Sequence, residues 1–354
     1  MENKNNMDFN PKEIIRKLSA KENIDEKDAY DFILSVRGDK VSDVQMGAFS
    51  VSLFMKGPTA EEIAGIVKAM RKCCDYMHPN TEGILTDCCG TGGGKTTFNI
   101  STCSAIVAAA VGIPMAKHGS RSISALSGSA DAFEKLGVNI NLTPKQAERL
   151  IEETNISFLY APLFHPVMGK IFDPESQLGI KTVFYTIIGP LINPANAKAH
   201  VLGVYKASAV NLVSDVVLKL PYEHVLVVYG MDGFDEISIT GKTKVAEIKE
   251  GNRKFYEIAP EDFGLARASL KEIEGGTPEY NAEVIRSILS GREKGAKRDV
   301  VLLNAGAVIY VGGKAKTISE GINMARAVIE SSAAAKKLEE LVTVSNALKE
   351  GGKL

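Results

Sequence analysis

Tryptophan is absent from this 354-residue sequence, and cysteine is scarce, with five residues in all. The cysteines stand as two adjacent pairs and one single residue, at Cys73, Cys74, Cys88, Cys89 and Cys103. This spacing supplies neither a disulfide framework nor the CxxC pairs of a zinc site. We therefore expect reduced thiols.

The sequence also lacks an excess of charge and a long apolar run. Its 42 basic and 43 acidic residues leave a formal net charge of -1, so its total charge attracts neither nucleic acid nor an anionic membrane. No apolar run reaches the roughly 18–20 residues that span a bilayer. The beginning of the sequence is polar and has no apolar middle of the kind found in signal peptides. We expect a cytoplasmic protein with no nucleic-acid or membrane partner.

Apolar residues between position 10 and about position 75 recur at helical spacing. Ile14, Ile15 and Leu18 share one helical face. Thr59, followed three residues later by Glu62, forms a capping box that begins a helix. The pattern predicts four short helices without a strand, and hence a small helical domain.

After Gly83 the pattern changes to strand, loop, helix and strand, which is typical of an α/β layer with a parallel sheet. Further strands are predicted at 201–204 and 224–229. An antiparallel set is predicted at 237–240, 245–248 and 254–258, and helices from 281 onward.

A glycine-rich loop, Gly90–Thr97, lies between the first predicted strand and the next helix. Glycines let the backbone turn tightly and direct its N–H groups at one point. The helix adds its positive end there, with Asn99, Ser101 and Thr102 in its first turn. We interpret the loop as a phosphate cradle. A nucleoside-triphosphate P-loop would need a glycine at the position of Cys89, so that interpretation fails.

Two further segments carry polar side chains just after predicted strands. Lys117–Ser122 (KHGSRS) and the following Ser127–Asp131 (SGSAD) supply cations and hydroxyls where open α/β sheets bind ligands, which suits an anion. Asp232, Asp235 and Glu236 place carboxylates on a later loop. Such oxygen donors, together with substrate phosphates, are the usual ligands of Mg²⁺.

Taken together, these motifs resemble the anthranilate phosphoribosyltransferase family, which shares a fold with the pyrimidine nucleoside phosphorylases. The resemblance covers nearly the whole chain and rests on KGPTAEEIAG, GTGG, TFNIST, KHGSRS, SGSAD, YAPLFHP, GPLINPA and DGFDE. It implies a small all-helical domain plus a larger α/β domain with a central mixed, mainly parallel sheet flanked by helices. The helical domain would span 1–80 with a returning segment near 163–195, and the α/β domain 81–162 and 196–354.

The resemblance also implies an activity and a set of site residues. The activity is Mg²⁺-dependent transfer of phosphoribosyl from phosphoribosyl pyrophosphate to a small aromatic acceptor, by a homodimer that pairs through the helical domain. Positioning and electrostatics, with no covalent catalytic residue, would drive it. The implied donor-binding residues are Gly90, Gly92, Gly93, Thr97, Asn99, Ser101, Thr102, Lys117 and Ser129. The implied metal ligands are Asp235 and Glu236, with Ser101 on a second ion. The implied acceptor-binding residues are His118, Ser120, Tyr160, His165 and Glu175.

The sequence departs from the family mainly on the acceptor side. Ser120 replaces an asparagine, and Glu175 replaces the arginine that meets the carboxylate of anthranilate. The glycine loop is one residue shorter and lacks an aspartate, and the stretch before Gly189 is one residue longer. We therefore expect a phenol or an amine without a carboxylate as acceptor. The alternatives are a true anthranilate phosphoribosyltransferase, a nucleoside phosphorylase and a non-catalytic paralogue that binds nucleic acid.

Overall fold

The computed structural model describes residues 9–92, 97–122 and 126–350. The chain forms two compact units: Met1–Asp75 with His165–Ile192, and Tyr76–Phe164 with Asn193–Leu354. The chain thus leaves the first unit and later returns to it. Within the described residues, none of the helices is long and apolar enough to cross a membrane.

The first unit is helical, as predicted. Its elements are α1 (Pro11–Ser19), α2 (Glu26–Arg37), α3 (Asp43–Lys56), α4 (Ala60–Cys73), α9 (Pro166–Leu178), the π-helix η1 (Phe184–Ile188) and α10 (Gly189–Leu191). The predicted capping box of Thr59 and Glu62 is present at the start of α4. Phe32 and Phe49 are fully buried and stack with ring centroids 3.9 Å apart. Burial of such a ring stabilises the fold by about 1.5–3 kcal/mol.

The π-helix η1 ends directly before Gly189, in the stretch that we expect to be one residue longer than in the family. A π-helical turn bonds residue i to i+5 instead of i+4, so it accommodates one extra residue without breaking the helix. The expected insertion and the π-helix thus fall at the same place, between α9 and α10.

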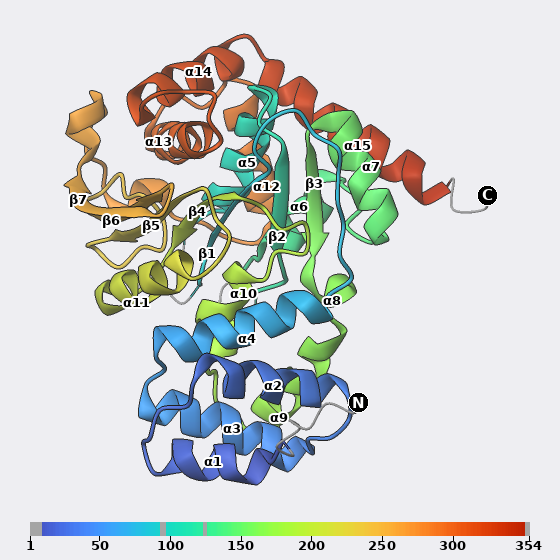
Figure 1. Ribbon diagram of the computed structural model, residues 1–354. Helices are drawn as coiled ribbons and strands as arrows, with labels where there is room; N and C mark the ends of the chain where they lie inside the picture. The colour runs from blue at the N-terminus through green and yellow to red at the C-terminus, as the bar shows by residue number, and fades with distance from the viewer. Residues whose placement is uncertain (1–8, 93–96, 123–125, 351–354) are drawn as a thin grey trace. The chain divides into compact units, whose positions relative to one another are not determined.

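The second unit is an α/β domain whose seven-stranded sheet has the order β3-β2-β1-β4-β5-β6-β7 (Figure 1). The strands are β1 (Thr86–Gly90), β2 (Met115–Gly119), β3 (Ile156–Tyr160), β4 (Ala199–Gly203), β5 (His224–Gly230), β6 (Thr243–Lys249) and β7 (Asn252–Ile258). Strands β1 to β5 are parallel, and β6 and β7 continue the sheet antiparallel. The predicted mixed, mainly parallel sheet is confirmed.

Helices flank this sheet. They are α5 (Ile100–Ala110), α6 (Ser129–Leu136), α7 (Pro144–Thr154), α8 (Ala161–Phe164), α11 (Ala207–Leu218), α12 (Pro278–Leu289), α13 (Ala296–Val311), α14 (Ile318–Glu330) and α15 (Ala333–Glu350), with 3-10 turns η2 (Pro260–Phe263) and η3 (Leu270–Ile273). Helices α5 and α13 are apolar nearly all round, as expected of helices buried between a sheet and other helices. Figure 1 shows α13 and α11 on opposite sides of strands β4 to β6.

The order of the strands positions the site. The chain leaves β1 through α5 to its neighbour β2, and it leaves β4 through α11 to β5 on the other side. Because the two crossovers run in opposite directions, the carboxyl ends of β1 and β4 form the topological switch point of the sheet, where open α/β sheets bind their ligands.

Three local features differ from expectation. The segment 237–240 is not a strand: the Ile237 N–H donates to Asn304 Oδ1 at 3.0 Å, and the Ser238 N–H donates to Thr243 Oγ1 at 2.9 Å. Side chains bond the N–H groups of Ile237 and Ser238, and the Ile239 carbonyl accepts from the N–H of Ala268, which is not in a strand. Strand β3 and helix α7 were not predicted from the sequence.

Candidate active site at the carboxyl ends of the parallel strands

The loop that carries Asp235 lies directly over the ends of β1 and β4. Asp235 Oδ2 accepts a hydrogen bond from the Gly92 N–H at 2.7 Å. A Cβ on Gly90 would overlap the Asp235 carboxyl, and a Cβ on Gly203 would overlap the Asp235 carbonyl oxygen. Only glycine permits this approach of one backbone to another. Sequence reasoning missed Gly203, because only the pairing of β1 with β4 places it beside Gly90.

Asp235 and Glu236 form a crowded, partly buried pair of carboxyls. Burial raises the pKa of Asp235. Burial, and then the neighbouring Asp235, raise the pKa of Glu236 to about 8, while the Lys117 ammonium and a backbone hydrogen bond from Ser101 act in the opposite direction. Adjacent carboxyls that resist ionisation together are suited to a divalent cation, whose charge would offset both. The donor set therefore fits Mg²⁺.

Asn99, at the start of α5, is held by side chains from two other segments. Its Oδ1 accepts from Asn281 Nδ2 at 2.9 Å and from Ser127 Oγ at 3.1 Å, and its Nδ2 donates to the Ser127 carbonyl at 3.3 Å. Thr97 is half-buried, whereas Thr102 is fully buried and its Oγ1 bonds to none of the described residues. Gly93 lies outside the described residues.

The carboxylate of Asp87, the second residue of β1, links β1 to β2 through hydrogen bonds. Its Oδ1 accepts from the N–H groups of Cys88 and His118 at 2.8 and 3.2 Å, and its Oδ2 accepts from Asn193 Nδ2 at 2.7 Å. Asn193 also donates to the Ala116 carbonyl at 2.8 Å. These bonds fix the strand from which Lys117 and His118, both buried, project.

The two segments KHGSRS and SGSAD lie against each other. Ser129 Oγ donates to the carbonyl of Ser120 at 3.3 Å. Arg121 pairs with Asp131 at 2.7 Å and with Glu134 at 2.6 Å, and its guanidinium lies 5.7 Å from the ring centroid of Tyr160, the last residue of β3. The candidate residues of the α/β unit are thus gathered at the carboxyl ends of the parallel strands and in the loops that follow them.

The remaining two candidates, His165 and Glu175, belong to the helical unit. His165 is buried, and burial lowers its pKa to about 4, so its imidazole is neutral at physiological pH. Glu175 is also buried and accepts a hydrogen bond from Thr182 Oγ1. Burial raises the pKa of Glu175, whereas the hydroxyls of Thr182 and Ser50 act to lower it. The Glu175 carboxyl therefore lies inside the helical unit, and its Oε2 bonds to none of the described residues.

Two family models match the chain: "Glycosyl transferase family, a/b domain" over residues 82–335 and "Glycosyl transferase family, helical bundle domain" over residues 12–74. Together with the fold, they define a glycosyltransferase built from a helical bundle and an α/β domain. The anthranilate phosphoribosyltransferase of Acetivibrio thermocellus is 46% identical over 336 residues, 95% of this chain and 96% of the relative. That of Methanococcoides burtonii is 48% identical over 305 residues, 86% of each chain.

Solved structures give the same result. The anthranilate phosphoribosyltransferase of Thermus thermophilus has a TM-score of 0.88 at 38% identity, over 94% of this chain and 99% of that one. The Saccharomyces cerevisiae enzyme, in complex with PRPP and Mg, has a TM-score of 0.86 at 27% identity, over 95% and 98%. The chain belongs to the anthranilate phosphoribosyltransferase family, and it is a phosphoribosyltransferase.

Proposed function

We propose that this enzyme transfers phosphoribosyl from phosphoribosyl pyrophosphate to a small aromatic acceptor, with Mg²⁺, and releases pyrophosphate. The observation that carries the proposal is the crowded pair Asp235 and Glu236, held over the switch point of the sheet beside the Gly92 N–H and facing the buried Lys117. Support also comes from the S. cerevisiae relative, whose structure contains PRPP and Mg.

In this proposal the chain acts by positioning and charge. Positive charge grows on the ribose as its bond to pyrophosphate breaks, as in glycoside hydrolysis. Negative charge grows on the leaving pyrophosphate, where Lys117 and the N–H groups of the glycine loop and of the start of α5 stabilise it. Asp235 and Glu236, with Ser101 for a second ion, would hold Mg²⁺, which supplies charge neutralisation for the pyrophosphate.

We further propose that the acceptor has no carboxylate. An arginine in place of Glu175 would bind a carboxylate through two charge-assisted hydrogen bonds. Glu175 supplies no such donor, and its own carboxyl is already bonded to Thr182. A phenol, a polyhydroxybenzene or an aromatic amine needs no cationic partner there.

Other cations could substitute for the lost arginine, but two of them are already paired. Lys170 pairs with Asp39, and Arg121 pairs with Asp131 and Glu134. Exposed pairs of this kind stabilise by only about 0–1 kcal/mol each, so either cation can leave its partner at little cost. Lys181 is exposed.

Anthranilate itself is the second candidate acceptor, and the names of relatives 46% and 48% identical to this chain favour it. Steady-state pyrophosphate release with phosphoribosyl pyrophosphate and Mg²⁺ distinguishes the two. We expect a kcat/KM for anthranilate below about 10⁴ M⁻¹s⁻¹ and a higher value for an acceptor without an acid group. A kcat/KM for anthranilate at or above that range would show that the carboxylate is accepted.

A pair of variants isolates the contribution of residue 175 to the choice of acceptor. Glu175→Arg should raise kcat/KM for anthranilate at least tenfold over Glu175→Gln, which only removes the charge. Because Glu175 is buried, the thermal unfolding of both variants should be measured alongside. Equal anthranilate kinetics in two folded variants would mean that residue 175 does not meet the acceptor.

We also propose that the enzyme is a homodimer paired through the helical unit. Three apolar side chains of α3, Val44, Phe54 and Met55, are exposed on this unit. Large apolar groups gathered on one element often mark an interface. Light scattering during gel filtration tests this, and a monomer at micromolar concentration would contradict it.

A further inference from the structure

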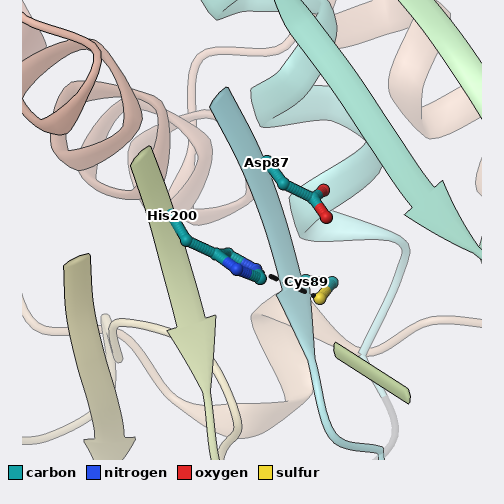
Figure 2. Close-up of side chains that lie close together, drawn as sticks. All are labelled: Asp87, Cys89 and His200. Carbon is teal, nitrogen blue, oxygen red and sulfur yellow. Dashed lines mark hydrogen bonds between the residues drawn. The ribbon is translucent and has the colours of Figure 1, made fainter. Parts of the chain in front are cut away.

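Three side chains of different donor type lie together near the end of β1, outside the residues assigned to the donor and acceptor. Asp87 and Cys89 are two residues apart on β1, so both project from the same face of the sheet. His200 on β4 is the direct partner of Asp87 in the strand pairing, so it projects there as well. Figure 2 shows the His200 imidazole pointing at the Cys89 thiol across the gap between the strands.

The ligand atoms are close enough for a common metal ion. One carboxylate oxygen, the Cys89 sulfur and one His200 nitrogen all lie within 4.8 Å of one another. Cys89 Sγ and His200 Nε2 are 3.3 Å apart. A tetrahedral zinc ion, with bonds of about 2.0–2.3 Å, separates its ligand atoms by about 3.6 Å. The cysteine and histidine already have nearly this spacing, and the carboxylate needs to move by at most about 1.2 Å.

We propose that Asp87, Cys89 and His200 form a binding site for a borderline divalent cation such as Zn²⁺. A set of one oxygen, one nitrogen and one sulfur ligand suits Zn²⁺ or Co²⁺, whereas Mg²⁺ takes oxygen ligands. The proposed site therefore differs in chemistry from the pair Asp235 and Glu236. It leaves a fourth coordination position for water.

The hydrogen bonds of the three residues are compatible with a metal. Cys89 and His200 form a hydrogen bond, and a metal ion would replace the proton between them, since a coordinated thiol is deprotonated. Asp87 Oδ2 accepts a hydrogen bond from Asn193 and can offer its second lone pair. Asp87 and His200 are fully buried, whereas Cys89, near the end of β1, is partly exposed.

Co²⁺ serves as the probe, because a thiolate bound to Co²⁺ gives a charge-transfer absorption that Mg²⁺ and carboxylates do not. The full chain is titrated with Co²⁺ in excess Mg²⁺, which occupies the carboxylate pair. We expect the absorption in the wild type, together with proton release, and its disappearance when Zn²⁺ is added in competition. This readout needs no turnover, so it is independent of the proposed function.

Substitutions at Cys89 and His200 test whether these side chains bind the metal ion. Cys89→Ser should abolish the absorption and His200→Gln should weaken Co²⁺ binding at least tenfold. Cys74→Ser, a buried cysteine of the helical unit, is the matched control and should bind as the wild type does. Thermal unfolding of each variant shows that it is folded. No absorption in the wild type, or an undiminished one in Cys89→Ser, overturns the proposal, and the wild-type result decides even where a variant fails to fold.

Discussion

Two carboxyls near opposite ends of β5 show contrasting environments. Glu247, on β6 beside the start of β5, accepts hydrogen bonds from His224 Nε2 at 2.8 Å, Tyr310 OH at 2.7 Å and Tyr256 OH at 3.0 Å. The bond from His224, helped by both tyrosines, lowers the pKa of Glu247 to about 2. Glu236 follows the other end of β5, and there burial and a neighbouring carboxyl raise the pKa to about 8.

In our proposal, the difference separates a carboxyl that stabilises the fold from one that binds a metal ion. The partners of Glu247 come from β5, β7 and α13, so this carboxylate ties three elements to β6. The pKa values of Glu236 and Asp235 are raised, so ionising both carboxyls costs stability, and the Mg²⁺ that we propose there would offset this cost. Such locally unfavourable groups concentrate at functional sites.

The largest effect is expected from removing the carboxyls of Asp235 and Glu236. Asp235→Ala with Glu236→Ala should lower phosphoribosyl transfer at least about 100-fold, equivalent to about 2.7 kcal/mol of transition-state stabilisation. Because the two carboxyls lower stability when no metal is bound, the thermal unfolding midpoint of the double variant in chelator should not fall below that of the wild type. The control is the exposed acidic pair of η2, Glu261→Ala with Asp262→Ala, which should leave turnover intact. Normal turnover in the first double variant would refute its metal-binding role.

Gly203→Ala should have the next largest effect, because the added Cβ must displace the Asp235 carbonyl. We expect kcat/KM for phosphoribosyl pyrophosphate to fall about 10–100-fold, or about 1.4–2.7 kcal/mol. The control is Gly169→Ala, whose Cβ would meet open space. Wild-type kinetics in a folded Gly203→Ala enzyme would mean that the Asp235 loop need not lie over β4 during turnover.

Glu247→Gln should lower the free energy of unfolding by about 2 kcal/mol at pH 7, without changing turnover. The folded-state pKa of about 2 lies below the unfolded value of 4.5. The contribution of Glu247 is therefore present above pH 4.5 and is lost as the pH falls from 4.5 to 2. The difference in free energy of unfolding between wild type and variant, measured from pH 7 down to pH 2, should shrink below pH 4.5 and vanish only near pH 2.

The matched control for Glu247 is Glu257→Gln on β7, whose pair with Lys242 is exposed. Such a pair is worth less than about 1 kcal/mol. If the two variants lost the same stability, the hydrogen bonds of Glu247 would not be the source of its effect.

Glu236→Gln should give the smallest effect, of the opposite sign. Its folded-state pKa of about 8 lies above the unfolded value of 4.5, so the stability of the metal-free wild type should fall as the pH rises from 4.5 to 8. Glutamine does not ionise, and the variant should gain about 1 kcal/mol over the wild type near pH 8, or about 2 °C in Tm. A lower Tm than wild type in chelator would contradict the raised pKa.

Sequence analysis selected Gly90, Lys117 and Asp235, and the structure brings all three to one end of the sheet; their binding roles stay predictions. It selected them because each lies at or shortly after the end of a predicted strand, and the carboxyl ends of parallel strands share one edge. Glu175 shows the limit of this reasoning. We expect it at the place of an arginine of the family, but its hydrogen bond to Thr182 inside the helical unit could not be read from the sequence.

The sequence by itself determined the features that depend on a few neighbouring residues. The capping box at Thr59, the strand–loop–helix order around Gly90 and the apolar pattern of α13 all arise from interactions along one element. Tertiary structure alone decided which strands are neighbours. It placed Gly203 beside Gly90, and it brought His200 to Cys89 across 111 residues. The physical reason is that strand order follows from packing of the whole sheet, and no local pattern near Gly203 or His200 encodes it.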